Sequence, residues 1–340
     1  MTFFIGEIGV NHENNIDNAL KMIDHLSYAK WDAAKFQSYK ANKLARKESP
    51  SYWDTSKEKI KSQHELFSKF DSWNIQEYKY LQKYCLKKGI EFMTTAFDLD
   101  TLNDIDELVI RHKISSSDIT NFQLINAVAK KNKPIILSTG ASNLNEIERA
   151  VKWIKQVNDK PLCLLHCVLR YPTEIKYANI GRINSLIKSG LAESYGYSDH
   201  TVPPSSFEAI KASLTFGATV IEKHFTYNKD LPGNDHYHAF DKDDAFQMRE
   251  IDNFQTQLIG SSKIEVEGEE SARENARRSL TSTRKIFKGE FLTKDNITAK
   301  RPLKGGICAS KWIEFIGKKV IRDINLDEPI LYSDIENVYN

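Results

Sequence analysis

The chain has 340 residues, of which 40% are apolar, and its 48 basic and 46 acidic side chains leave a formal net charge of +2. Charges this balanced and interspersed argue against a nucleic-acid binder, and the length suits one α/β domain of about 250 residues with a small appendage. No run approaches the about 18 apolar residues of a membrane span, and residues 1–7 lack the features of a signal peptide, so we expect a cytoplasmic protein with no membrane contact.

Short runs with β-strand character recur along the chain, and helical periodicity fills the stretches between them, as in Leu144–Ile154. Most runs are separated by about 20 to 35 residues, which is the length of a βα unit. The eight runs are Phe3–Glu7, Ala33–Gln37, Glu91–Thr95, Val109–Ser115, Pro134–Thr139, Pro161–His166, Ser194–Tyr197 and Ala218–Glu222.

Eight such units predict a TIM (β/α)8 barrel, which we expect to occupy residues 1–262. An open doubly wound sheet is the alternative, but no run is followed by the Gly-x-Gly-x-x-Gly fingerprint of that fold. Polar residues also follow nearly every strand rather than gathering at one switch point. This distribution favours the barrel.

The connection from Tyr39 to about Ile75 is unusually long and carries Pro50, Trp53 and many lysines. Connections of this length are commonly functional loops. We expect this one to lie over the mouth of the barrel and to cover the substrate.

The pattern changes near the end of the chain. Residues 263–280 are interpreted as a linker, because an acidic stretch gives way there to a basic one. Residues 281–340 predict a small β-rich domain, in which Lys288–Ile297 is echoed by Leu326–Ile335 as a repeated turn, Glu, apolar pair and Asp-capped turn. A domain of about 60 residues is expected to need packing against another surface for stability.

The four cysteines are Cys85, Cys163, Cys167 and Cys308, and none forms a Cys-x-x-Cys pair. On a strand, Cys163 and Cys167 would lie about 13 Å apart, too far to share a disulfide or a metal. We expect all four to be reduced and buried.

Two histidines, His200 and His224, stand at the exits of the last two predicted strands. Neighbouring parallel strands are about 4.8 Å apart, so two imidazoles that leave the same end can bind one divalent ion. Either histidine alone would more ordinarily be a buried strand-end residue. The polar residues around them favour a metal site.

Two lysines on predicted strands, Lys35 and Lys113, point into the barrel. An inward lysine is costly unless an anion neutralises it, and two of them beside small hydroxyls suit a ligand with phosphate and carboxylate groups. Structural ion pairs with Glu13 or Asp118 are the alternative. A Schiff-base lysine would need no metal, whereas the histidine pair favours Lewis-acid activation of a carbonyl. The residues expected at the mouth are Glu13, Lys35, Gln37, Thr95, Lys113, Ser116, Asp118, Ser138, Tyr171, Ser198, His200, Glu222 and His224.

Six segments in order resemble the sialic acid synthase (N-acetylneuraminate synthase) family, and the tail from Arg278 to Pro302 looks like its antifreeze-like (SAF) domain. The resemblance covers essentially the whole chain, and six motifs in sequence are strongly specific. The segments are Glu7–Glu13, Ala34–Gln37, Ile136–Gly140, Tyr197–Thr201, Glu222–Thr226 and Pro232–Asp235.

The resemblance implies that phosphoenolpyruvate condenses with an N-acylated hexosamine such as N-acetylmannosamine, giving a nonulosonic acid and phosphate. It implies that His200 and His224 hold Mn²⁺, or Mg²⁺ or Co²⁺, against the sugar aldehyde. Glu13 or Glu222 would act as acid or base, and Asp235 would hold the sugar. The implied ligands of phosphoenolpyruvate are Lys35, Thr95, Lys113, Ser116, Ser138 and Ser198, and Gln37, Asp118 and Tyr171 also count as substrate-binding.

The family pattern further implies a domain-swapped homodimer, in which Arg301 of the SAF domain reaches a partner subunit's barrel and contacts the N-acyl group of the substrate. A surface arginine without that role is the ordinary alternative.

Departures from the family pattern concern the sugar more than the reaction. Leu169 replaces a polar Asn, with Arg170 beside it to compensate, and Asp118 stands where Glu is usual. His236 and His238 follow the Pro232–Asp235 motif and could add metal or hydroxyl contacts. A legionaminic or pseudaminic acid synthase is therefore an alternative. A non-catalytic sugar-phosphate-binding barrel and a metal-dependent aldolase or isomerase stay open from other classes.

Overall fold

The computed structural model describes residues 2–233, 235–261, 263–264 and 267–336. Asn234 of the Pro232–Asp235 motif lies outside the described residues, as do residues 1, 262, 265–266 and 337–340 of the expected domains and linker. The chain divides into two compact units, Met1–Gly260 and Ser261–Asn340, and each is described by itself.

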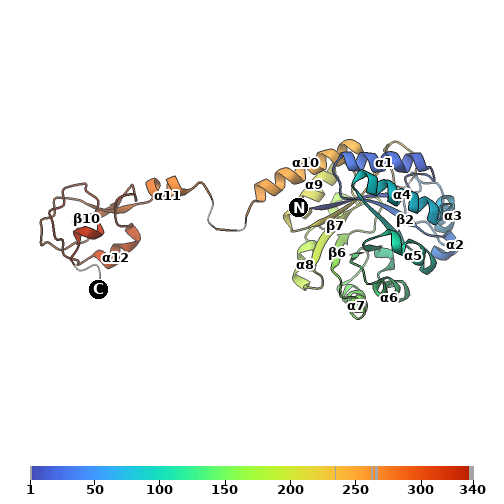
Figure 1. Ribbon diagram of the computed structural model, residues 1–340, viewed down its shortest axis with the longest axis horizontal. Coiled ribbons are helices and arrows are strands. Elements are labelled where there is room, and N and C mark those ends of the chain that lie inside the picture. The colour runs from blue at the N-terminus through green and yellow to red at the C-terminus, as the bar shows by residue number, and fades with distance from the viewer. Residues whose placement is uncertain (1, 234, 262, 265–266, 337–340) are drawn as a thin grey trace. The chain divides into compact units, whose positions relative to one another are not determined.

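The first unit is a barrel of eight parallel strands, with helices around it (Figure 1). The order is β3-β2-β1-β8-β7-β6-β5-β4, and β3 and β4 at its two ends lie side by side and close the barrel. The predicted TIM barrel is confirmed. The strands are β1 (Phe3–Gly9), β2 (Ala33–Ser38), β3 (Glu91–Ala96), β4 (His112–Ile114), β5 (Ile135–Ser138), β6 (Leu162–Cys167), β7 (Ser194–Asp199) and β8 (Val220–His224).

Strand β4 is shorter than the predicted run Val109–Ser115. The residues before it form a 3-10 turn, Asp106–Leu108, and the Val109 amide bonds back to the Asp106 carbonyl. Lys133 Nζ donates to the carbonyl oxygens of Asp106 and Val109, which holds this segment out of the ladder.

Helices alternate with the strands, and several begin with a polar cap. Asn143 caps α7 reciprocally with Glu146, so the helix predicted over Leu144–Ile154 begins as expected and extends one residue further. The helices of this unit are α1 (Ile16–Tyr28), α2 (Ala41–Leu44), α3 (Gln63–Phe70), α4 (Ile75–Lys88), α5 (Leu99–Ile105), α6 (Phe122–Lys130), α7 (Leu144–Lys155), α8 (Arg182–Ser189), α9 (Ser205–Thr215) and α10 (Lys242–Ile259). Among the described residues, no helix is long and apolar enough to cross a membrane.

Side chains alternate along each strand between two environments. On β2, Ala34 and Phe36 belong to the large core between the sheet and the helices, whereas Ala33 belongs to a small apolar cluster inside the barrel. The inner cluster consists of Ile5, Ala33, Met93, Ile136, Cys163, Leu165 and Val220. Two residues further along β1, β2, β3, β5 and β8, the next inward residue is polar, and these residues contribute to the site described below: Glu7, Lys35, Thr95, Ser138 and Glu222.

The second unit contains a two-stranded antiparallel sheet, β9 (Ser279–Ser282) with β10 (Ile297–Lys300), and two short helices, α11 (Glu270–Ala276) and α12 (Trp312–Phe315). Helix α11 lies within the segment expected to be a linker. The unit has its own apolar core, formed by Leu280, Ile286, Leu292, Ile297, Ile307, Phe315, Val320, Ile324, Ile330 and Ile335.

The repeat predicted in this unit has equivalent local structures. Glu290 accepts from the Phe287 amide, and Glu328 accepts from the Asn325 amide three residues before it. Gly289 and Asp327, which precede the two glutamates, both have positive φ, +91° and +65°. The repeat thus encodes one turn twice.

All four cysteines are free thiols, as predicted. Three of them are buried, but Cys308 is only half-buried, so the expectation of full burial is wrong there.

Candidate active site

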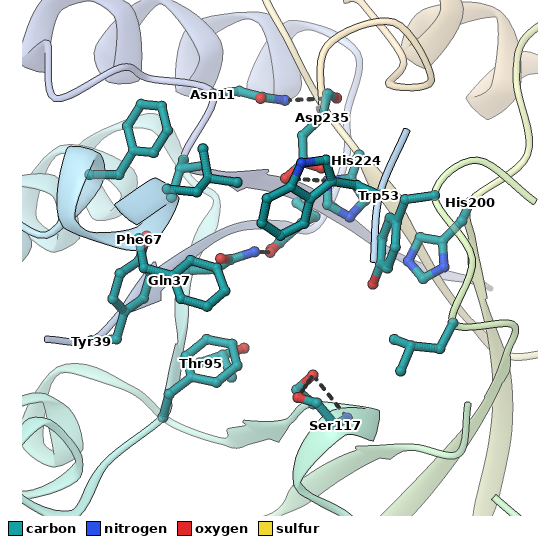
Figure 2. Close-up of a pocket in the computed structure, with 18 of the residues that line it drawn as sticks. Asn11, Gln37, Tyr39, Trp53, Phe67, Thr95, Ser117, His200, His224 and Asp235 are labelled. Atoms are coloured by element: carbon teal, nitrogen blue, oxygen red, sulfur yellow. Dashed lines mark hydrogen bonds and ion pairs between the residues drawn. The ribbon is translucent and has the colours of Figure 1, made fainter. Parts of the chain in front are cut away.

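A cavity of about 380 Å³ opens at the carboxyl ends of the strands, within the range of small-molecule sites. Every residue predicted at the barrel mouth lines it, and Asp235 lines it as well. Arg301 lies in the second unit and is exposed. Figure 2 shows part of the lining, with Thr95 and Ser117 at one end and His200, His224 and Asp235 at the other.

Four charged side chains form the floor of this cavity, and all are buried. Lys35 Nζ lies 2.5 Å from Glu7 Oε2 and 3.7 Å from Glu222 Oε2. Lys113 Nζ lies 3.7 Å from Glu222 Oε1 and donates to Ser138 Oγ at 2.7 Å. The alternative that paired these lysines with Glu13 or Asp118 is wrong, because the strand register places Glu7 beside Lys35 and brings β8 alongside β1.

The electrostatics of the two lysines differ. Burial tends to lower the pKa of Lys35, but Glu222 and Glu7 together raise it above its ordinary value. For Lys113 burial prevails, and its pKa is lowered despite the attraction of Glu222. Because Glu222 faces both lysines, its pKa is lowered although burial opposes the shift. Of the two lysines, Lys113 has its charge balanced less completely by neighbouring carboxylates. An incoming anion would therefore stabilise the charged form of Lys113 more than that of Lys35.

Sequence reasoning missed Glu7. Burial raises the pKa of its carboxyl group, and the positive charge of Lys35 offsets only part of that rise. The sequence signal for Glu7 is the alternation of side chains along β1. Ile5 faces the inside of the barrel, so Glu7, two residues later, faces the inside as well. The sequence instead indicates Glu13, because it follows the strand. It lies on the exposed rim of the cavity, with positive φ and a hydrogen bond from the Tyr227 hydroxyl at 3.1 Å.

Small hydroxyl groups surround the charged floor. Thr95 Oγ1 accepts from Lys35 at 3.4 Å, and Ser198 Oγ donates to Glu222 Oε1 at 3.2 Å. Gly140 is required beside Ser116, because a Cβ there would come within 3.0 Å of Ser116 Oγ and 2.7 Å of the Cys167 sulfur. Lysines and hydroxyls on several strands thus converge on one space suited to an anion.

His200 is oriented by its backbone surroundings. Its Nδ1 lies 2.9 Å from the Val168 carbonyl oxygen, so Nδ1 carries the proton and Nε2 is left with a lone pair. The residue before it, Asp199, forms a fully buried ion pair with Lys223 at 2.6 Å, which anchors the end of β7. Tyr171 lies against the His200 ring, with centroids 4.4 Å apart.

The predicted histidine pair is brought together at one end of the cavity. The ring centroids of His200 and His224 are 5.5 Å apart. Burial lowers the pKa of His200 to about 4 and holds that of His224 well below its ordinary value. Both imidazoles are therefore neutral at physiological pH, which is the form that binds metals.

Asp235 and His238 join His224 in a cluster that sequence reasoning did not assemble. One ligand atom from each of the three lies within 4.8 Å of the others. Although burial opposes the shift, His224 and His238 lower the pKa of Asp235, so its carboxyl group is ionised. Neutral imidazoles with a carboxylate are a donor set that suits divalent metals. The spacing Asp-x-x-His was the available signal.

The segment that carries Asp235 is tied to the barrel by Asn11, a residue that sequence reasoning also missed. Its Nδ2 donates to the backbone oxygens of Phe225 at 3.0 Å and Asp235 at 3.2 Å (Figure 2). His236 lines the cavity with its Nδ1 2.8 Å from Thr226 Oγ1.

The long connection between β2 and α4 supplies an aromatic wall, in keeping with the predicted loop over the mouth (Figure 2). Trp53 is buried and its indole nitrogen donates to the Ile60 carbonyl at 3.1 Å. The apolar lining from this connection and its surroundings consists of Tyr39, Leu44, Tyr52, Trp53, Leu66, Phe67, Phe70 and Phe97.

Leu169 faces the same cavity, whereas Arg170 is not among the described residues that line it. Arg170 binds Glu174 at 3.0 Å and covers the Tyr177 ring. The expectation that Arg170 compensates for Leu169 is therefore wrong.

Comparison with known proteins gives matches along the whole chain. A model of the NeuB family matches residues 22–263, and one of the SAF domain matches residues 277–336. An N,N'-diacetyllegionaminic acid synthase of Campylobacter jejuni is 34% identical, covering 97% of this chain and 98% of that protein. The spore coat polysaccharide biosynthesis protein SpsE of Bacillus subtilis is 31% identical, covering 98% and 93% respectively.

Among solved structures, an N-acetylneuraminic acid (sialic acid) synthetase from Leptospira borgpetersenii, crystallised in complex with citrate, superposes with a TM-score of 0.70 at 31% identity. The match covers 80% of this chain and 89% of that one.

Proposed function

Since this chain belongs to the NeuB family, we propose that it condenses phosphoenolpyruvate with an N-acylated hexosamine to give a nonulosonic acid and phosphate. Relatives named as synthases of legionaminic and pseudaminic acids, and of N-acetylneuraminate 9-phosphate, support this reaction class. The observation that carries the proposal is the buried floor on which Lys35, Lys113 and their neighbouring hydroxyls converge.

In this proposal the floor binds phosphoenolpyruvate. Lys35 and Lys113 supply positive charge, and the hydroxyls around them supply short donors for phosphate and carboxylate oxygens. The hydroxyl donors are Thr95, Ser116, Ser138 and Ser198. Fixing an anion here holds the phosphoenolpyruvate methylene towards the histidine end, where the sugar aldehyde would lie.

A divalent metal ion, with Mn²⁺ as the first candidate, is proposed at the histidine end. The neutral imidazoles and the ionised Asp235 fit such an ion, and His224 is its central ligand in this proposal. The family resemblance implies His200 as the second histidine ligand. When bound, the ion supplies Lewis-acid polarisation of the aldehyde.

The atoms balance with one water molecule. The phosphoenolpyruvate methylene carbon bonds to the aldehyde carbon, the water oxygen adds to C2, and the bond between C2 and the phosphate oxygen breaks. The two water protons end on the former aldehyde oxygen and on the phosphate. Glu222 is ionised and buried between the lysines, so we assign it the proton from water, while Glu13 on the rim faces the sugar end.

The aromatic wall and Leu169 favour a sugar with apolar substituents. A 2,4-diacetamido-6-deoxyhexose presents a methyl group and a second acetyl group, where N-acetylmannosamine presents hydroxyls. We therefore propose the diacetamido-deoxyhexose as the preferred acceptor, and the legionaminic acid synthase among the relatives agrees with that choice.

Phosphate release from phosphoenolpyruvate and Mn²⁺ with a panel of hexosamines tests the proposal. We expect release only when a sugar is present, with kcat/KM at least about 10-fold higher for the diacetamido-deoxyhexose, because about 1.4 kcal/mol of apolar contact suffices. A higher kcat/KM for N-acetylmannosamine would contradict the sugar assignment. No release with any sugar would favour a non-catalytic binding barrel, and sugar cleavage or isomerisation without phosphate would favour an aldolase or isomerase.

The role of Arg301 and the homodimer stay predictions from the resemblance. Arg301→Ala should raise the KM for the hexosamine and leave the KM for phosphoenolpyruvate unchanged, because one hydrogen bond to the N-acyl group is lost. Mixing this variant with His224→Ala protein should restore activity, since a mixed dimer would combine an intact barrel with an intact arginine. If subunit exchange is demonstrated and activity is still not restored, the result contradicts an arginine that acts across the dimer. Arg284→Ala, another exposed arginine of the second unit, is the control.

A further inference from the structure

One carboxyl group stands within the aromatic wall of the cavity. Glu58 belongs to the connection between β2 and α4, and it lines the cavity together with Tyr52 and Trp53. Only 8% of its surface is exposed. The structure describes every residue of this connection, and of its acidic side chains Glu58 alone is buried and alone lines the cavity. The reaction proposed above gives this group no role.

The backbone around Glu58 holds it in place. The connection forms an arm here that bonds back on itself. The Ser51 amide donates to the Lys61 carbonyl at 2.8 Å, and the Trp53 indole nitrogen donates to the Ile60 carbonyl at 3.1 Å. Glu58 lies within the turn that these two bonds close, so its position is set by the arm itself.

The carboxyl group of Glu58 is only partly satisfied by the protein. Its Oε1 accepts from the Ile60 amide at 3.0 Å. Among the described residues, no donor bonds to Oε2, and no Lys, Arg or His pairs with either oxygen. Oε2 is also not one of the described atoms that are enclosed without a partner, so a ligand can reach it. Buried carboxyl groups are ordinarily paired with a cation or with several donors, and the open oxygen therefore indicates a place for a ligand's donor.

The charge of Glu58 indicates which ligand this is. The carboxylates of the floor, Glu7 and Glu222, pair with Lys35 and Lys113. Glu58 has no such cation, and a carboxylate without one repels the phosphate and carboxylate groups of phosphoenolpyruvate. It suits a neutral molecule that donates hydrogen bonds, which in the proposed reaction is the acceptor sugar.

The wall around Glu58 narrows the choice of donor on that sugar. In the proposed function, the wall contacts the substituents that distinguish the diacetamido-deoxyhexose from N-acetylmannosamine. These are the methyl group and the acetamido group at C4, and the amide N–H is the only hydrogen-bond donor between them. An amide placed against apolar side chains without a partner is costly, and a carboxylate oxygen removes that cost.

We propose that Glu58 Oε2 accepts a hydrogen bond from the N–H of the acylamino group at C4 of the acceptor sugar. Glu58 thereby determines specificity at C4, whereas the floor and the histidine end act on phosphoenolpyruvate and on C1. The inference rests on the proposed function, because it names the residue that recognises the second acylamino group of that acceptor.

The test uses the full-length protein, phosphoenolpyruvate, Mn²⁺ and two acceptors that differ only at C4. One is the 2,4-diacetamido-6-deoxyhexose, and the other is the matching 2-acetamido-6-deoxyhexose with a hydroxyl at C4. In Glu58→Gln protein, the amide oxygen can keep the bond to Ile60, and the amide NH₂ then replaces Oε2. A donor would thus meet the N–H of the sugar.

We expect Glu58→Gln to raise the KM for the diacetamido sugar by about 10- to 100-fold, the effect of losing a charge-assisted hydrogen bond. The KM for the sugar with a C4 hydroxyl should change by less than about 3-fold, because a hydroxyl can also accept from the new NH₂ group. The KM for phosphoenolpyruvate should not change. Glu48→Gln is the matched control, since Glu48 is exposed in the same connection and does not line the cavity.

A purely structural role for Glu58 predicts a different result. If it only shapes the arm, Glu58→Gln should affect both sugars equally or affect neither. Either outcome would overturn the proposal.

Failure of this contact and failure of the condensation are distinguishable, because calorimetry measures binding of the same two sugars without turnover. Phosphate release with equal effects on both sugars would remove the contact and leave the proposed function standing. Without phosphate release from any sugar, an affinity loss in Glu58→Gln that is confined to the diacetamido sugar would support the contact and remove the proposed function. If neither sugar binds to the unaltered protein or reacts, both fall.

Discussion

His224→Ala protein should lose about 10³-fold or more in kcat/KM for the condensation, and excess EDTA should do the same to the unaltered protein. His224 belongs to every metal arrangement considered, because it is adjacent to both His200 and the Asp235–His238 pair. In the proposed reaction, its removal would take away the ion that is to polarise the aldehyde, a contribution of several kcal/mol. Phosphate release measured with saturating phosphoenolpyruvate gives the comparison.

Added Mn²⁺ should restore the EDTA-treated protein but not the variant. His25→Ala is the matched control, since His25 lies on α1 outside the barrel and away from the cavity lining. Full activity in excess EDTA would refute the metal requirement.

Lys113→Met should raise the KM for phosphoenolpyruvate by about 10- to 100-fold, the effect of losing a charge-assisted contact of about 1.5 to 3 kcal/mol. Lys113 is preferred to Lys35 for this test. Glu222 keeps Lys35 as a partner when Lys113 is gone, whereas loss of Lys35 would leave Glu7 buried without a cation.

The pH dependence follows from the charge on Lys113. Because burial lowers its pKa, the binding cation is lost at lower pH than for an ordinary lysine, so the KM should rise as the pH is raised. The variant should lack this rise. Lys57→Met, in the same long connection as the aromatic wall, is the control. An unchanged KM in Lys113→Met would mean that this lysine is structural.

The barrel could be predicted because its signals are local. Each strand is a short run that ends in polar residues, and the helices between them carry their own periodicity and caps, as at Asn143. For the same reason the residues that line the mouth were largely predictable, since strand ends in a barrel converge on one face.

The contacts within the site were not predictable, because they depend on register and on loop paths. The sequence indicates Glu13 rather than Glu7, since only the pairing of β1 with β2 shows that Glu7 lies beside Lys35. The meeting of His224 with Asp235 and His238 depends on a segment that turns back over β8, held there by Asn11. The alternation along β1 and the Asp235-x-x-His238 spacing are signals for these residues, but neither shows which side chain the residue meets.

The floor and the aromatic wall of the cavity are built on different parts of the chain. Lys35, Lys113 and Glu222 sit on strands whose register is fixed by their neighbours, so a change there disturbs the whole barrel. The wall comes mainly from the connection between β2 and α4, which no ladder of the barrel constrains. If the proposed function holds, acceptor preference can diverge through insertions and substitutions in one loop while the proposed phosphoenolpyruvate chemistry on the strands is inherited intact, an evolutionary freedom that the architecture itself provides.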